Sequence, residues 1–156
     1  MSGKSRTARV LGRAMRMRGL GWMFHGTPGT PKVLVLVHRG RKSGRLYKTP
    51  LSILAEDPER GEVFVSPMWS RDSDWYRNVI AGGLVEIHVR GETRQVEWRE
   101  LDEVEGRAAG EAFRDSYPIY SRMALRMLAR LNKLEGDPAE AVARNLPMLG
   151  LRRVGS

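Results

Sequence analysis

Short apolar segments with the spacing of strands dominate the middle of the chain. Residues 33–37 form a continuous run of Val and Leu, which is typical of a buried strand. Further strand patterns occupy residues 47–55, 62–66, 85–90 and 95–99, and glycine-containing turns separate them. Pro50 marks an edge or a bulge within the second of these strands. Two hairpins in succession predict an antiparallel meander rather than a βαβ unit.

Helical spacing appears at both ends of the pattern. Residues 5–18 predict a short helix with an arginine stripe, and a second short helix begins near Trp75 and ends at Gly82 and Gly83. Two longer helices are expected over 102–116 and 119–135, and a short one begins at Asp137. A last strand is expected over 146–153. The prediction is an α+β, mainly β fold: an antiparallel barrel of five or six strands with helices packed outside.

Composition narrows the chemistry. The chain has 156 residues and no cysteine, which excludes disulfides, thiolate catalysis and iron–sulfur clusters. Its three histidines lack metal-ligand spacing, so no metal site is expected. No apolar run reaches the ~18 residues of a membrane span, and no secretory signal is apparent, so the expected location is cytoplasmic. The net charge of +9 favours an anionic partner.

The sharpest local feature is the turn at residues 38–48, which is basic and contains no acid. Glycines at 40 and 44 flank it, so its backbone N–H groups can form a concavity for an anion. Arg41 and Lys42 would add charge to such a cradle. The alternative is a charged hairpin that prevents strands of two molecules from pairing at their edges. The residues alone leave both interpretations open.

A second feature is the aromatic density of residues 66–78, which include Trp69, Arg71, Trp75, Tyr76 and Asn78. Aromatic rings can stack on a flat cofactor, and an amide can bond to its edge. Alternatively, Trp75 anchors its helix to the barrel.

A third feature is the pair Tyr117 and Tyr120, three residues apart at a helix start. They can line a substrate pocket, or Tyr120 can belong to the core.

Three motifs in this order resemble the deazaflavin-dependent nitroreductase family. They are Gly-Arg-Lys-Ser-Gly at 40–44, Thr-Pro-Leu at 49–51 and Ser-Asp-Trp-Tyr-Arg-Asn at 73–78. The resemblance covers about Val33 to Leu101 and, more loosely, the rest of the chain. It implies a split β-barrel that uses reduced coenzyme F420 as a hydride donor. The expected substrate is a small hydrophobic molecule such as a quinone, an enone or a nitro compound.

The resemblance also assigns site residues. Arg41, Lys42 and Ser43 would hold the phosphate and acidic tail of F420. Pro50, Leu51 and Ser66 would lie near its ring, and Trp75, Tyr76 and Asn78 would close the site, with Arg71 counted among the cofactor-binding residues. Tyr117 and Tyr120 would face the substrate as catalytic residues. A third tyrosine, which the resemblance leads us to expect at this spacing, is Met123 here.

Other interpretations remain at this stage. Flavin mononucleotide (FMN) is the alternative cofactor, although the five basic residues between positions 39 and 48 favour the longer acidic tail of F420. A nucleic-acid-binding barrel is the alternative of another class, and Glu86, Glu92 and Glu97 on the later strands argue against it. Residues 1–26 are expected to form a basic amphipathic helix and lead-in, with the barrel domain over 27–156. That helix could contact a membrane surface, and the barrel could form a homodimer.

Overall fold

The computed structural model describes residues 29, 31–67, 72–137, 141 and 144–155. It contains two four-stranded antiparallel sheets. The first has the order β2-β1-β5-β6, from Leu46–Ser52, Val33–Arg39, Leu84–Val89 and Glu92–Arg94. The second has the order β3-β4-β8-β7, from Ala55–Asp57, Glu62–Val65, Leu149–Arg153 and Val96–Glu100.

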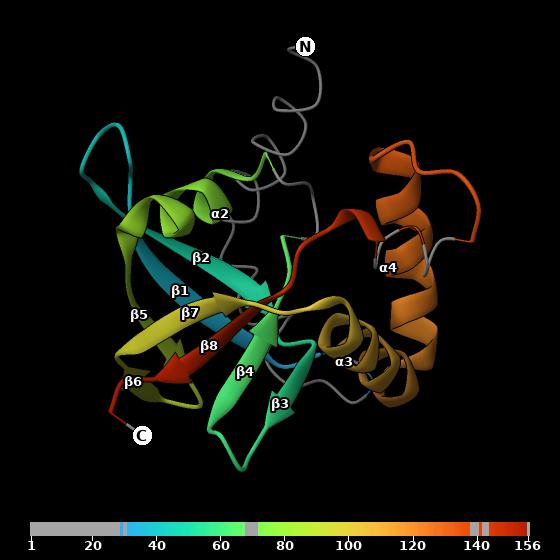
Figure 1. The fold of residues 1–156 in the computed structure, drawn as a ribbon, viewed down its shortest axis with the longest axis horizontal. Helices are drawn as coiled ribbons and strands as arrows, with labels where there is room; N and C mark the ends of the chain where they lie inside the picture. The colour runs from blue at the N-terminus through green and yellow to red at the C-terminus, as the bar shows by residue number, and fades with distance from the viewer. Residues whose placement is uncertain (1–28, 30, 68–71, 138–140, 142–143, 156) are drawn as a thin grey trace.

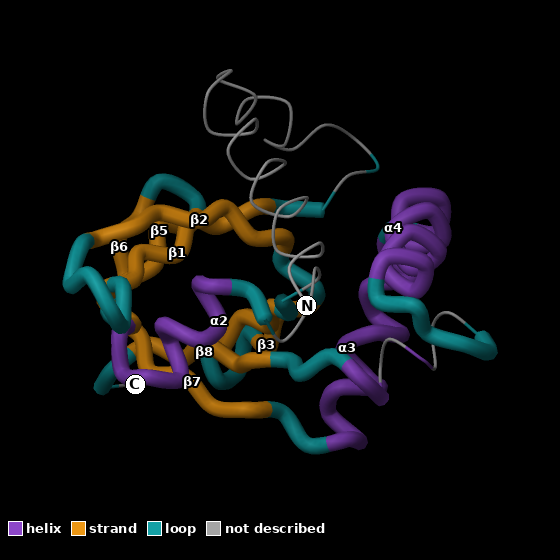
Figure 2. Tube along the Cα trace, turned by 90° about the horizontal axis from the view of Figure 1, so that it is seen from above, coloured by secondary structure: helices purple, strands orange, loops and turns teal. Residues whose placement is uncertain are grey.

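The helices lie at the margins of the sheets. The short α2 (Asp74–Asn78) continues into a π-helical turn, η2 (Val79–Gly83). Figures 1 and 2 show α2 at one end of the space between the two sheets, while α3 (Glu103–Ser116) and α4 (Pro118–Leu131) lie to one side. Within the described residues, no helix has the length and apolarity needed to cross a bilayer.

The core is shared by both sheets. Leu34 and Leu36 alternate on the inner face of β1, and Val65 and Leu151 face them from the second sheet in one cluster of buried side chains. The same cluster includes Trp75 and other residues of α2 and η2. Period-two burial therefore sets the register of each sheet.

The predicted strand over 47–55 is two strands, because the chain changes sheet within it. The Ile53 N–H donates to Lys32 O at 2.8 Å, beside the first sheet, and the Leu54 N–H donates to Phe64 O at 2.8 Å, in the second. The two predicted antiparallel hairpins are present, but they belong to different sheets and so do not form one meander. Pro50 lies in β2, which is an edge strand, as expected for a residue without an N–H.

Three further expectations need correction. The described part of the chain contains eight strand segments in two sheets, where five or six strands were expected. Among the described residues, helix and strand contents are about equal, so this part of the fold is α+β without being mainly β. The last strand begins at Leu149 instead of residue 146. The expected helix over 5–18 and the first residues of the helix expected at 137 lie outside the described residues.

Candidate functional site

A tight turn joins β1 to β2 at residues 40–44. The Gly40 N–H donates to Arg45 O at 2.8 Å, and the Gly44 N–H donates to Gly40 O at 2.9 Å. Gly44 has a φ of 68°, in the region that favours glycine. A Cβ on Gly40 would lie 2.6 Å from Ser43 Oγ and 2.8 Å from the Tyr47 ring. The turn therefore favours glycine at both positions.

Arg41 fastens this turn to α2. Its backbone N–H and its Nη1 both donate to Asn78 Oδ1, at 3.1 and 2.8 Å. Its Nη2 forms an ion pair with Asp74 Oδ1 at 3.2 Å. The guanidinium that the sequence assigns to cofactor binding is thus engaged by the protein itself.

Behind Arg41, a hydrogen-bonded chain runs through the buried side chains of Asn78 and His38. Asn78 Nδ2 lies 3.1 Å from His38 Nδ1, and His38 Nε2 lies 2.9 Å from Thr49 Oγ1. Because Asn78 Oδ1 accepts from Arg41, its amide nitrogen is the donor to His38. The imidazole is then neutral, with its proton on Nε2 and donated to Thr49. The chain links β1, β2 and α2 beneath the turn.

Lys42 differs from Arg41. Lys42 is exposed, and no carboxylate among the described residues pairs with its amine. The backbone N–H groups of Lys42 and Ser43 also have no acceptor in the described part of the chain. Arg45 and Lys48 add two more exposed cations beside them. This set of donors suits an anion such as phosphate or carboxylate.

The aromatic side chains of α2 point into the core. Trp75 and Tyr76 are both buried in the central cluster, with their ring centroids 6.0 Å apart in an edge-on arrangement. These contacts correspond to the anchoring interpretation of Trp75. They also fix α2, and hence Asn78 and Asp74, over the end of the sheets.

The residues expected near the ring have varied surroundings. Pro50 is exposed in the edge strand, whereas Leu51 belongs to the central core. Ser66 is buried, and its hydroxyl donates to Pro147 O at 3.1 Å. Arg71 lies outside the described residues.

Tyr117 and Tyr120 belong to a different cluster. Both are half-buried and pack on Phe113, with ring centroids at 5.5 and 6.1 Å. This cluster lies between α3 and the second sheet and includes Leu54 and Met148. The structure therefore brings the turn and α2 together but places the two tyrosines in a separate group.

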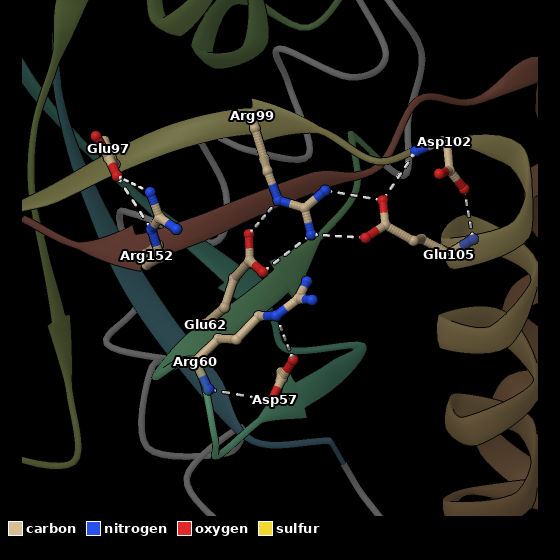
Figure 3. A network of polar contacts seen from close by, with 8 residues as sticks. All are labelled: Asp57, Arg60, Glu62, Glu97, Arg99, Asp102, Glu105 and Arg152. Atoms are coloured by element: carbon tan, nitrogen blue, oxygen red, sulfur yellow. Dashed lines mark hydrogen bonds and ion pairs between the residues drawn. The ribbon is translucent and has the colours of Figure 1, made fainter. Parts of the chain in front are cut away.

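A second polar feature is an ion network on the second sheet (Figure 3). Glu62 is buried and accepts from Arg99 at 2.8 and 3.0 Å, and Arg99 also donates to Glu105 at 2.8 and 2.9 Å. Glu105 completes a capping box with Asp102 at the start of α3. Hydrogen bonds from Arg99, then from the Asp102 N–H, lower the pKa of Glu105 to about 2. This network joins α3 to the sheet and has a structural role.

A cavity of about 580 Å³ is lined by residues of the β3–β4 turn and of β6 and β8. Figure 1 shows that the β3–β4 turn lies far from the β1–β2 turn at 40–44. Four arginines line the cavity, namely Arg60, Arg94, Arg152 and Arg153. Each has a carboxylate partner, among them Asp57, Glu92 and Glu97. Because these pairs neutralise its charge, this cavity is a poorer anion site than the turn.

Sequence reasoning missed His38 and Asp74. Neither belonged to a metal-like or catalytic pattern, because the partner of Asp74 lies 33 residues away in the chain and that of His38 lies 40 residues away. His38 lies next to the basic turn, which is the one signal that could have drawn attention to it.

Solved structures share this fold. An F420-H2-dependent reductase (FDR-A) aligns with a TM-score of 0.53 and 20% identity, covering 77% of this chain and 93% of that one. A protein described as a domain-swapped dimer aligns with a TM-score of 0.52 and 19% identity, covering 94% and 99%. The fold is therefore of the class that includes an F420-H2-dependent reductase.

The sequence itself gives the family. The model of the F420H(2)-dependent quinone reductase family matches residues 6–131. The chain belongs to that family and is an oxidoreductase. No curated protein matches it.

Proposed function

We propose that this enzyme reduces a quinone-like acceptor with reduced F420, and that the turn at 40–44 holds the anionic tail of the coenzyme. Membership of the quinone reductase family supports the reaction. The unpaired backbone N–H groups of Lys42 and Ser43, within the described part of the chain, support the location of the anionic tail at this turn. The chemistry supplied by bound F420H2 is donation of a hydride, which a quinone takes up with a proton to become a hydroquinone.

In this proposal Lys42 and Arg41 have different roles. Lys42, with the N–H groups around it, binds the negative charge directly. Arg41 is a positioning residue, because Asn78 and Asp74 already engage its guanidinium. Asn78 and His38 hold Arg41 and Thr49 in place from below. Pro50, Leu51, Ser66, Arg71, Trp75 and Tyr76 remain proposed cofactor-binding residues.

The test is fluorescence titration of the full chain with F420. We expect Lys42→Gln to weaken binding about tenfold, with a smaller salt dependence than the wild type, because one charge-assisted contact is lost. Arg114→Gln on α3 removes the same charge from another exposed site and should leave the dissociation constant unchanged. Equal affinity of Lys42→Gln and the wild type would refute the proposed location, although not the reaction.

A second titration separates positioning from direct binding. His38→Gln keeps a polar side chain but cannot reproduce both ring contacts. We expect a lower affinity for F420 with an unchanged salt dependence, since no charge is removed. A change in the salt slope would instead assign His38 a charged role.

Tyr117 and Tyr120 are proposed to face the substrate. Tyr117→Phe and Tyr120→Phe keep the ring contacts with Phe113 and remove only the hydroxyl. We expect a raised KM for a quinone such as menadione and an unchanged affinity for F420. Unchanged steady-state kinetics in both variants would remove these residues from the site.

The proposal extends to three further features: the closure of the sheets, the division of the chain and the oligomeric state. The two sheets are proposed to form a split barrel, since β5 contacts β7 where the sheets meet. Residues 1–26 are proposed as a segment separate from the domain at 27–156, on the basis of their sequence. A homodimer is proposed because a protein of the same fold is a domain-swapped dimer, and sedimentation equilibrium would test it.

A further inference from the structure

One strip of α4 exposes large apolar side chains. Ile119, Met123, Met127 and Leu131 recur every four residues and are 77, 69, 46 and 42% exposed. Residues four apart share one side of a helix, so the four side chains form a continuous strip. We call these residues the α4 strip.

The side of α4 next to the strip already has its partners. Ala124 and Leu128 are buried there, and Leu128 packs with Leu146 in a small cluster. Figures 1 and 2 both place α4 at the outer edge of the molecule, beside α3 and away from the strands. The apolar arc of α4 is therefore wider than the fold covers.

A row of cations borders the α4 strip. Arg122, Arg126 and Arg130 each follow a member of the strip by three residues, and all three are exposed. The helix contains no acidic residue. Exposed Ile, Met and Leu beside a row of arginines is the pattern of a helix that lies in the surface of a membrane.

The excess of positive charge is also concentrated in a few segments of the chain. Residues 1–28 contain six Lys and Arg and no acid, and α4 contains three and no acid. These two segments thus carry the whole formal charge of +9, and the rest of the chain is neutral. Residues 1–28 offer no carboxylate to the arginines of α4, so they do not complement its charge.

Two other binding partners fit the α4 strip less well than a membrane surface. A second copy that paired through α4 would bring arginine rows together without an acid between them. Single-stranded nucleic acid would find charge but no aromatic ring in the α4 strip on which a base could stack. We propose that the α4 strip and its arginine row dock the protein on an anionic lipid surface.

The test is co-sedimentation of the full chain with vesicles. We expect binding to phosphatidylcholine vesicles that contain phosphatidylglycerol, weaker binding to phosphatidylcholine alone, and a decrease as salt is raised. Replacing Arg122 and Arg126 by Gln should lower the partition coefficient about fivefold for each charge removed. The double variant Met123→Gln and Met127→Gln should also lower it, because less apolar area enters the lipid.

Matched controls lie on α3. Val104→Gln removes an exposed apolar side chain, and Arg114→Gln removes an exposed charge, and both should bind vesicles as the wild type does. Wild-type binding by the α4 variants would overturn the proposal, as would no binding by the wild type. A different result would assign the strip to a second copy of the chain: no vesicle binding by the wild type, and a molar mass in sedimentation equilibrium that is lower for the α4 variants than for the wild type. F420 titration of the same samples distinguishes this outcome from failure of the proposed reaction.

Discussion

Arg99 holds two carboxylates of unequal burial. Glu62 is 1% exposed and Glu105 31%, and the guanidinium lies between them. Such an arrangement favours arginine over lysine, because a planar fork can donate to both sides at once. The larger desolvation cost belongs to Glu62, because its buried carboxylate has lost most of its contact with water.

Replacing Arg99 by Met should therefore destabilise the protein by about 2–4 kcal/mol, because the Glu62 carboxylate would be left buried and unpaired. The measurement is urea denaturation followed by circular dichroism. Adding Glu62→Gln to Arg99→Met should recover part of the loss. If the double variant were no more stable than Arg99→Met, the cost would come from lost packing of the arginine side chain.

Gly150 of β8 is a second residue that Glu62 constrains. A Cβ at this position would overlap the Glu62 carboxylate, whereas a Cβ on Gly106 of α3 would lie 3.8 Å from Met148 Sδ, an ordinary contact. We expect Gly150→Ala to lower the melting temperature and Gly106→Ala to raise it slightly, by up to ~1 kcal/mol of helix propensity. Equal melting temperatures for the two variants would contradict the close packing of Glu62 on β8.

At the scale of elements, the first turn of α3 depends on a charged side chain. The pKa of Glu105 in the folded protein is about 2, below its ordinary value of 4.5. A group whose pKa falls on folding stabilises the folded state above its unfolded pKa and loses that effect as the pH falls toward the folded pKa. Protonation of Glu105 thus weakens the tie between α3 and the second sheet.

Glu105→Gln should accordingly be less stable than the wild type near neutral pH. The difference in melting temperature should shrink between pH 4.5 and about 2, as the wild-type carboxyl takes up its proton. Thermal denaturation across this range is the measurement. A difference that stayed constant with pH would mean that the shape of the side chain matters rather than its charge.

Elements with a strong local signal were predictable from the sequence. The run at β1, the glycines that end η2 and the two long helices all follow from periodicity and turn residues. The break between β2 and β3 was not predictable, since Ile53 and Leu54 continue the same apolar pattern across two sheets. The basic turn of the candidate site was apparent from the sequence. The attachment of Arg41 to Asn78 was not, because a contact between residues far apart in the chain produces no repeating pattern in the sequence.

At the scale of the whole molecule, one core joins both sheets and α2. We expect a single cooperative unfolding transition, because neither sheet can lose its inner face without exposing that of the other. Near-ultraviolet circular dichroism, which reports on buried Trp75, should coincide with the far-ultraviolet signal during denaturation. Separate midpoints for the two signals would show that the sheets unfold independently.

The position of β8 within the second sheet has a consequence for biosynthesis. Residues 149–153 lie between β4 and β7 in the sheet, although both neighbours precede them in the chain. On the ribosome, β4 and β7 must wait with unpaired edges until residue 153 has left the exit tunnel. Until then, a nascent chain would expose the unpaired backbone edges of β4 and β7 to other chains and to chaperones.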